Sequence, residues 1–209
     1  MLRALAALAL LSGCGIWPFG RPQQPADPVS LIEALRAGGY VIYLVPTDLA
    51  FWQRDDKPVL LEDCATQRNL STSGRAEARA IGVGFARLLI PVGEVRASPY
   101  CRSADTARLA FDRVLLDADL APLADADATQ RANRIAALRH LLGAAPPPGT
   151  NTIVVAQSEN LEALGEAPLD EGEAAAMKPL PGGGFQLIAR VPAQAWSTMQ
   201  SPAGGSVGR

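Results

Sequence analysis

Two short apolar runs constrain the fold more than any other feature of this 209-residue sequence. Residues 40–45 and 152–156 are rich in β-branched and aromatic side chains, and neither run alternates polar with apolar positions. Strands that are buried on both faces have this composition, and they occur mainly in parallel sheets covered by helices on both sides. The two runs therefore predict the central strands of an α/β domain.

Helical and extended patterns alternate along the rest of residues 28–199, and residues 46–70 look like a loop. Further strands are expected at 92–97 and 115–123, and helices at 28–37, from a Ser71 N-cap to about Leu89, and at 100–111, 129–142 and 160–164. Residues 177–180 and 185–191 flank a Pro-Gly-Gly-Gly turn and predict a hairpin at a sheet edge. The sequence thus predicts one three-layer α/β/α domain with a mostly parallel sheet and a C-terminal edge hairpin, followed by a disordered tail at 200–209.

The N-terminus has the layout of a secretory signal peptide, because a short basic start precedes the apolar residues 4–11. Eight residues are too few to span a bilayer, which needs about 20. The run closes on Leu11, Ser12, Gly13 and Cys14, which resemble the lipobox of bacterial lipoproteins. The resemblance implies that residues 1–13 are removed and that Cys14 is lipidated. The alternative is an ordinary cleavable signal with an incidental cysteine.

Residues 14–27 contain three prolines and predict a semi-extended tether between Cys14 and the domain. Acyl chains on one cysteine would hold the domain at a membrane without any transmembrane helix. By resemblance to sorted lipoproteins, Gly15 after the cysteine favours the outer membrane over the inner one. We therefore expect a lipid-anchored, periplasm-facing protein of the cell envelope.

Composition excludes several classes of function. The formal net charge is −2, Lys57 and Lys178 are the only lysines, and no block of like charges occurs, so a nucleic-acid partner is not expected. Three cysteines are too few and too far apart for a zinc framework, and no metal or cofactor is expected. His140 is the single histidine, which limits acid–base chemistry before any motif is considered.

Several segments, in order and spacing, resemble the histidine phosphatase (phosphoglycerate mutase-like) superfamily. These are residues 39–43, 63–71 with Gly74 and Arg75, 98–103 with Thr106 and Ala107, and 153–161. The resemblance covers roughly residues 28–196 and implies the histidine phosphatase-like α/β fold. In that family the first strand ends in Arg-His, and the histidine attacks phosphorus while the arginine, a second arginine and a second histidine hold the phosphoryl oxygens.

This sequence departs from the family pattern at three of those four positions. Val45 and Pro46 stand where the resemblance places Arg-His, Gln157 stands where it places the second histidine, and only Arg102 is retained. A proline offers no side-chain lone pair to attack phosphorus, and a glutamine cannot carry a positive charge. The resemblance therefore implies a catalytically inactive member that acts as a binding or interaction module for an unidentified envelope ligand or protein. The alternative is a family enzyme with residual or altered hydrolytic chemistry on a phosphorylated envelope substrate.

The retained arginine is the best candidate for anion binding, because Arg102 lies near the start of a predicted helix. Its alternative role is an ion pair with a helix neighbour such as Asp105. The resemblance also places Arg68 at the border of the pocket, where it would face the cleft or form a salt bridge within the loop. Family topology brings Cys64 and Cys101 to one end of the sheet, which would allow a disulfide in an oxidising compartment. The alternative is two separate buried thiols.

Two other residues are considered and set aside as catalytic candidates. His140 falls near the end of a predicted helix and is expected to act as a cation beside the helix C-terminus. Ser158 follows a buried strand and precedes a helix, as the serine of a hydrolase does. It lacks flanking glycines, and the only histidine precedes it in the chain, so a serine hydrolase is not expected.

Overall fold

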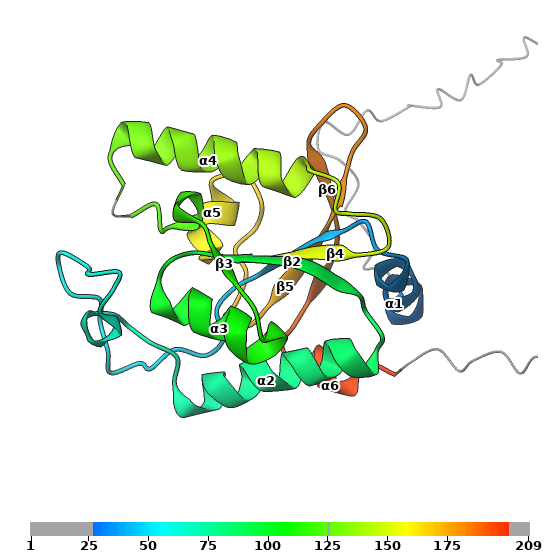
Figure 1. Ribbon diagram of the computed structural model, residues 1–209, viewed down its shortest axis with the longest axis horizontal. Helices are drawn as coiled ribbons and strands as arrows, with labels where there is room; N and C mark the ends of the chain where they lie inside the picture. The colour runs from blue at the N-terminus through cyan, green and yellow to red at the C-terminus, as the bar shows by residue number, and fades with distance from the viewer. Residues whose placement is uncertain (1–26, 125, 201–209) are drawn as a thin grey trace, which may run out of the picture.

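A mixed six-stranded sheet forms the centre of the computed structural model, which describes residues 27–124 and 126–200 (Figure 1). Its strand order is β3-β2-β4-β1-β5-β6. The strands are β1 (Val41–Leu44), β2 (Val92–Ala97), β3 (Leu115–Leu116), β4 (Asn151–Val155), β5 (Ala174–Pro179) and β6 (Phe185–Val191). The first four are parallel to one another, whereas β5 runs antiparallel to β1 and to β6. The mostly parallel sheet and the C-terminal edge hairpin are thus confirmed.

Helices cover both faces of the sheet and complete the three layers (Figure 1). One face carries α1 (Pro28–Ala37), α2 (Thr72–Arg87), α3 (Cys101–Phe111) and α6 (Ala195–Thr198), and the other carries α4 (Ala128–Gly143) and α5 (Ser158–Glu162). Along β1, Ile42 and Leu44 enter one hydrophobic core while Val41 and Tyr43 enter the other. Because both faces are covered, β1 and β4 are buried along their whole length, as their composition predicts.

Local side chains account for where the helices begin. The Asp27 carboxylate accepts a hydrogen bond from the Ser30 backbone N–H at 3.3 Å, and Pro28 occupies the first turn, where its missing N–H is not needed. Ser71 caps α2 through the Gly74 backbone N–H at 2.9 Å. Asp127 and Gln130 form a capping box at the start of α4. These caps satisfy backbone donors that the first helical turn leaves without partners.

Two glycines allow α2 to pack closely against its neighbours. A Cβ atom on Gly82 would lie 2.0 Å from the Ala110 carbonyl oxygen of α3, and one on Gly84 would lie 2.4 Å from the Trp196 carbonyl oxygen of α6. Glycine lowers the intrinsic stability of a helix by about 1 kcal/mol relative to alanine. Here the missing side chains let three helix backbones approach over the same core, which offsets that cost.

The structure corrects the bounds of three predicted elements. Residues 115–123 do not form one extended segment, because β3 has two residues and a 3-10 helix follows at Ala118–Leu120, capped by the Asp117 side chain. Burial of Leu120 against the α4 side of the sheet ends the strand early. The helix expected at 160–164 is α5, which begins at Ser158, and the first strand of the hairpin already begins at Ala174.

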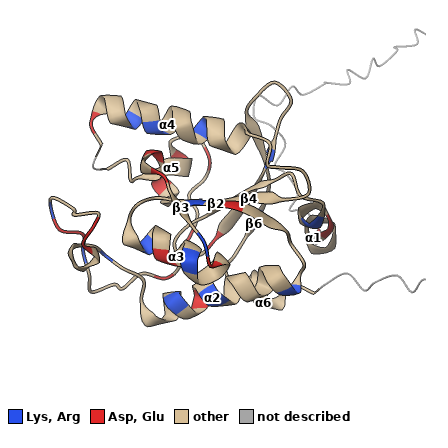
Figure 2. Cartoon of the chain, viewed as in Figure 1, with Lys and Arg blue, Asp and Glu red and all other residues tan. Residues whose placement is uncertain are grey.

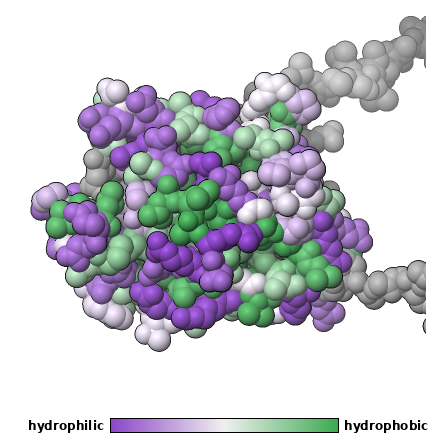
Figure 3. Space-filling model, in the orientation of Figure 1, coloured by the Kyte–Doolittle hydropathy of each residue, from purple (hydrophilic) through white to green (hydrophobic). Residues whose placement is uncertain are grey.

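The outer edge of the sheet is apolar on the face seen in Figure 3, where a hydrophobic patch lies over the position of β3 in Figure 1. Leu115 and Leu116 of this edge strand are both more than half exposed. Within residues 27–124 and 126–200, no helix has both the length and the apolar character needed to cross a membrane. The predicted signal peptide, the predicted lipidation site Cys14 and nearly all of the predicted tether and tail lie outside the described residues.

Candidate functional site

The candidate site lies at the carboxyl ends of three parallel strands. Val155 at the end of β4 pairs in register with Leu44 of β1 on one side and with Ala97 of β2 on the other. The segments that leave these strands therefore start at the same edge of the sheet, where ligands of open α/β sheets bind. Val45 and Pro46 leave β1, and Arg102 belongs to the first turn of α3 after β2. Gln157 precedes α5 after β4 and makes no capping hydrogen bond with its side chain.

Val45 and Pro46 are buried and present no nucleophilic or cationic side chain. Val45 is 6% exposed and packs in the core on the α4 side. Its backbone N–H donates to the Glu173 carbonyl at 3.0 Å, and the Pro46 carbonyl accepts from the Gly172 N–H at 3.1 Å. The chain leaving β1 is thus tied by its backbone to the segment before β5, and its side chains fill space.

The guanidinium of Arg102 is held by an internal carboxylate. Arg102 is 6% exposed, and its Nη1 atom lies 2.8 and 3.1 Å from the two carboxylate oxygens of Asp55. The same Nη1 contacts the Arg68 carbonyl at 3.3 Å, and the Arg102 guanidinium carbon lies 4.7 Å from the centre of the Tyr100 ring. Asp55 therefore supplies the negative charge that a bound anion would otherwise bring to Arg102.

Gln157 has a neutral side chain and joins the ends of β1, β2 and β4 through hydrogen bonds. Its side-chain oxygen accepts from Arg102 Nε at 3.2 Å, and its side-chain nitrogen donates to Ser103 Oγ at 3.1 Å. Its backbone carbonyl accepts from the Tyr43 hydroxyl at 2.5 Å. Burial, followed by the negative charges of Glu159 and Glu162, holds the pKa of Tyr43 well above its usual range, so the hydroxyl stays protonated as a donor.

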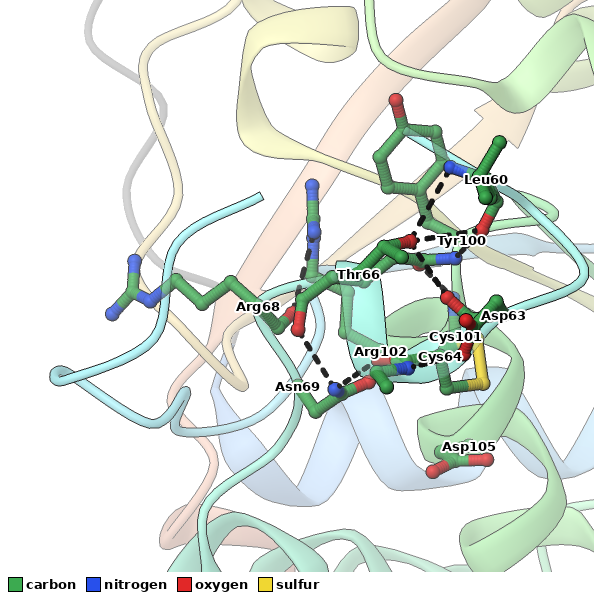
Figure 4. The surroundings of a disulfide bond; sticks show 12 residues. Leu60, Asp63, Cys64, Thr66, Arg68, Asn69, Tyr100, Cys101, Arg102 and Asp105 are labelled. Carbon is green, nitrogen blue, oxygen red and sulfur yellow. Dashed lines mark hydrogen bonds between the residues drawn. A yellow bond between two sulfur atoms is a disulfide. The ribbon is translucent and has the colours of Figure 1, made fainter. Parts of the chain in front are cut away.

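Asp55 reaches Arg102 because the long loop after β1 is fixed at several points. The Arg68 backbone N–H donates to Asp55 Oδ1 at 2.8 Å, and the Cys101 backbone N–H donates to the buried Gln67 side-chain oxygen at 2.8 Å. A disulfide joins Cys64 of this loop to Cys101 at the start of α3, with 5.7 Å between the Cα atoms (Figure 4). Cys64 is exposed and Cys101 is buried, so the alternative of two separate buried thiols is wrong.

The other charged candidates have partners of their own. Asp105, the helix neighbour considered for Arg102, instead lies 2.9 Å from Arg75 and 3.7 Å from Arg108. That pairing was therefore wrong, because Arg102 points into the fold whereas Asp105 lies at the helix surface. Arg68 donates through Nε to the Ala50 carbonyl at 3.2 Å and lies 3.6 Å from Glu171, so it forms a salt bridge at the border of the site.

The two residues set aside in the sequence lie outside this cluster. The Ser158 hydroxyl donates to Glu162 at 2.7 Å and accepts from the Leu169 N–H at 2.9 Å, so it makes structural contacts within α5 and the following loop. His140 is exposed in the last turn of α4, as its position in the sequence predicts. In the described part of the chain, no group of three or more His, Cys, Asp or Glu side chains is arranged to hold a metal ion.

One acidic residue beside the site gives a pH-dependent contribution to stability. Arg190 donates to both carboxylate oxygens of Glu173, at 2.8 and 2.7 Å, and these bonds hold the pKa of Glu173 below its usual value of about 4.3. A lowered folded-state pKa adds stability that is complete above the unfolded-state pKa and is lost as the pH falls through the folded-state pKa. We expect Glu173→Gln to lower the melting temperature at pH 7. The difference from the unmodified protein should shrink as the pH falls below about 4.3 and should vanish only below the lowered folded-state pKa. Melting curves across this pH range test it, with the exposed Glu62→Gln as a control that shows no such convergence.

The sequence alone did not identify Asp55, Ser103 or Tyr43 as parts of the site. Ser103 directly follows Arg102 in the motif, which was a signal that could have been used. Asp55 lies 47 residues before Arg102 in an irregular loop, and nothing local to it indicates where its carboxylate points. Tyr43 falls within an apolar strand, where an aromatic residue is most simply read as core.

Comparisons with known proteins support the fold. No protein-family model matches the sequence, and no curated protein sequence matches it. The structure is similar to the protein histidine phosphatase SixA in complex with tungstate, with a TM-score of 0.53 and 17% identity over 74% of this chain and 97% of that chain. It is similar to a mycobacterial glucosyl-3-phosphoglycerate phosphatase, with a TM-score of 0.52 and 16% identity over 74% of this chain and 100% of that chain. It also resembles a phosphoserine phosphatase from Entamoeba histolytica, with a TM-score of 0.51 and 11% identity over 75% of this chain and 98% of that chain. The chain therefore has the histidine phosphatase-like fold that its motifs predicted.

Proposed function

We propose that this protein is a catalytically inactive, histidine phosphatase-like lipoprotein that acts as a binding or interaction module in the bacterial envelope. The observation that carries the proposal is the ion pair between Asp55 and Arg102, whose closest N···O distance is 2.8 Å. Arg102 is the one family phosphate ligand that the sequence retains, and an acidic side chain of the same chain already holds it.

The chemistry of the neighbouring positions supports the loss of catalysis. Pro46 stands at the position of the attacking histidine and has no nucleophilic atom in its side chain. Gln157 stands at the position of the second histidine and remains neutral, so it cannot supply positive charge to a transferring phosphoryl group. Loss of a nucleophile lowers turnover by roughly a millionfold in enzymes where it has been removed.

The charge balance around Arg102 supports the loss of phosphate affinity as well. An incoming phosphate would have to displace the Asp55 carboxylate, which contacts Nη1 with both oxygens. Before displacement, the two anions would repel each other across a few ångströms in a partly dehydrated environment, where charges interact more strongly than in water. Asp55 thus acts as a built-in competitor for any anionic ligand at this position.

Placement in the envelope rests on residues 11–14 and on the disulfide. Disulfides persist in oxidising compartments such as the periplasm, and Cys64–Cys101 fits an exported protein. The membrane is then a partner through Cys14, and the ligand or protein bound by the domain faces the periplasm. Metabolic labelling with palmitate tests the anchor: the unmodified chain should incorporate label and the Cys14→Ser chain should not.

A phosphatase assay tests the loss of catalysis. The protein is incubated with 4-nitrophenyl phosphate and with a phosphohistidine peptide, beside an intact histidine phosphatase under the same conditions. We expect turnover at least about a millionfold below that of the intact enzyme. Turnover within a hundredfold of that enzyme, abolished by Arg102→Met, would instead establish a family enzyme with altered chemistry.

A further inference from the structure

A cavity lies beside the candidate site, between the long loop and the first half of α4. Its volume is about 410 Å³, and among the described residues it is lined by Lys57, Pro58, Val59, Leu61, Tyr100, Ala121 and Arg134. It shares none of the positions that correspond to the family's catalytic residues. Tyr100 connects the two regions, because its ring also contacts the guanidinium of Arg102. The volume falls within the range of small-molecule sites in proteins.

Among the described residues, no acidic side chain of the wall balances the charge of Arg134 at this cavity. Lys57 and Arg134 line the cavity, and no Asp or Glu does so among the described residues. The Arg134 guanidinium donates through Nη1 to the Pro122 carbonyl at 2.6 Å and has no carboxylate partner in the described part of the chain. A neutral carbonyl orients the guanidinium but leaves its charge in place. Arg134 thus differs from Arg102, whose charge Asp55 balances.

The remaining wall is apolar and fixed in place. Pro58, Val59, Leu61 and Ala121 line the cavity together with Tyr100, which is itself 4% exposed. The loop that supplies most of this wall is held by the Gln67 side chain, which donates to the Leu60 carbonyl at 2.9 Å. The disulfide joins the same loop to the residue after Tyr100 (Figure 4). A fixed apolar wall loses little conformational freedom when a ligand binds.

We propose that this cavity binds a small organic anion that carries an aromatic or aliphatic group. Arg134 holds the acidic group, and the apolar wall takes the hydrocarbon part. A small ring that carries a carboxylate, sulfonate or phosphate monoester matches both the charged part and the apolar part of the cavity. Inorganic phosphate matches only the charged part of the cavity, and an uncharged aromatic compound matches only the apolar part. The inference adds a ligand class to the proposed binding role but does not depend on the absence of catalysis.

Fluorine NMR with 4-fluorophenyl phosphate tests the proposal on the full lipidated chain in phosphatidylcholine nanodiscs, with empty nanodiscs subtracted. We expect saturable binding of this probe and at least tenfold weaker binding of 4-fluorobenzyl alcohol and of inorganic phosphate. Arg134→Met should weaken binding of the probe by about 10-fold to 100-fold, the loss typical of one charge-assisted hydrogen bond. Arg139→Met is the matched control, because it removes the same charge from an exposed site on the same helix. Figure 2 shows the basic positions along α4. Arg139→Met should change the Kd less than twofold.

A second pair of variants covers the case in which Arg134→Met fails to fold. Leu61 is 43% exposed at the cavity, so both Leu61→Asp and Leu61→Asn should fold. The carboxylate should abolish binding by repelling the probe, and the neutral amide of the same shape should retain most of it. The proposal is overturned if Arg134→Met and Arg139→Met weaken binding equally, or if Leu61→Asp binds as well as Leu61→Asn. It is also overturned if Arg102→Met abolishes binding that Arg134→Met retains.

The same spectra separate this proposal from the proposed function. Hydrolysis of the probe would release 4-fluorophenol, which has its own fluorine resonance. Appearance of that resonance together with Arg134-dependent binding would contradict the loss of catalysis and leave the cavity proposal standing. Absence of both hydrolysis and saturable binding would overturn the cavity proposal alone.

Discussion

Removing the Cys64–Cys101 disulfide should lower the free energy of unfolding by about 4 kcal/mol. The two cysteines are 37 residues apart, and a cross-link over that separation restricts the unfolded chain by about this amount in the chain-entropy model. For a domain of this size the melting temperature should fall by roughly 10 °C. Denaturant unfolding of the Cys64→Ser, Cys101→Ala double variant measures the change directly.

Reduction of the unmodified protein provides the matched control for that variant. Cys64 is exposed, so the serine that replaces it removes little packing, and most of the effect should come from the cross-link. The reduced protein and the double variant should therefore unfold at the same denaturant concentration. Trypsin should also cleave faster after Arg54, because the bond holds its loop to α3. A loss below 1 kcal/mol, with unchanged proteolysis, would show that the remaining loop contacts fix the segment without the bond.

Neutralising Asp55 should turn the site into one that binds phosphate. Asp55→Asn keeps the size of the side chain but removes the charge that Arg102 now contacts at 2.8 Å. We expect the variant to be less stable by about 2 kcal/mol, at the low end for a broken ion pair because the Asp55 side chain is 29% exposed. Phosphate should then stabilise it: for a Kd of about 1 mM, 10 mM phosphate adds about 1.4 kcal/mol. The melting temperature should rise by about 4 °C in phosphate, while that of the unmodified protein stays constant.

The neighbouring residue supplies a control with the same change in charge. Asp56 is exposed, and Asp56→Asn should leave both stability and the response to phosphate unchanged. Potassium chloride at equal ionic strength separates binding from screening. Adding Arg102→Met to Asp55→Asn should remove the response. If the unmodified protein responds to phosphate as strongly as Asp55→Asn does, Asp55 does not block the site and the proposed loss of anion binding is wrong.

The sequence by itself determined the parts of this protein that depend on local chemistry. Residues 40–45 and 152–156 specify buried strands because their composition suits burial on both faces, and the caps at Asp27 and Ser71 use side chains within three residues of the donors they satisfy. The order of strands and helices then favours a parallel sheet. The number of histidines limits the function in the same way. His140 is the only histidine in the sequence, so a catalytic site that needs two histidines cannot form.

Only the tertiary structure decided which charges meet at the ends of the strands. The spacing of residues along a helix suggested that Arg102 pairs with Asp105, three residues later. Arg102 is instead 6% exposed and points away from the helix surface, where Asp105 pairs with Arg75. Its partner, Asp55, comes from an irregular loop whose path depends on a disulfide and on backbone hydrogen bonds to distant residues. Such a loop has no periodicity that relates position in the sequence to direction in space. The pairing of Asp55 with Arg102 could therefore be found only once the whole chain was folded.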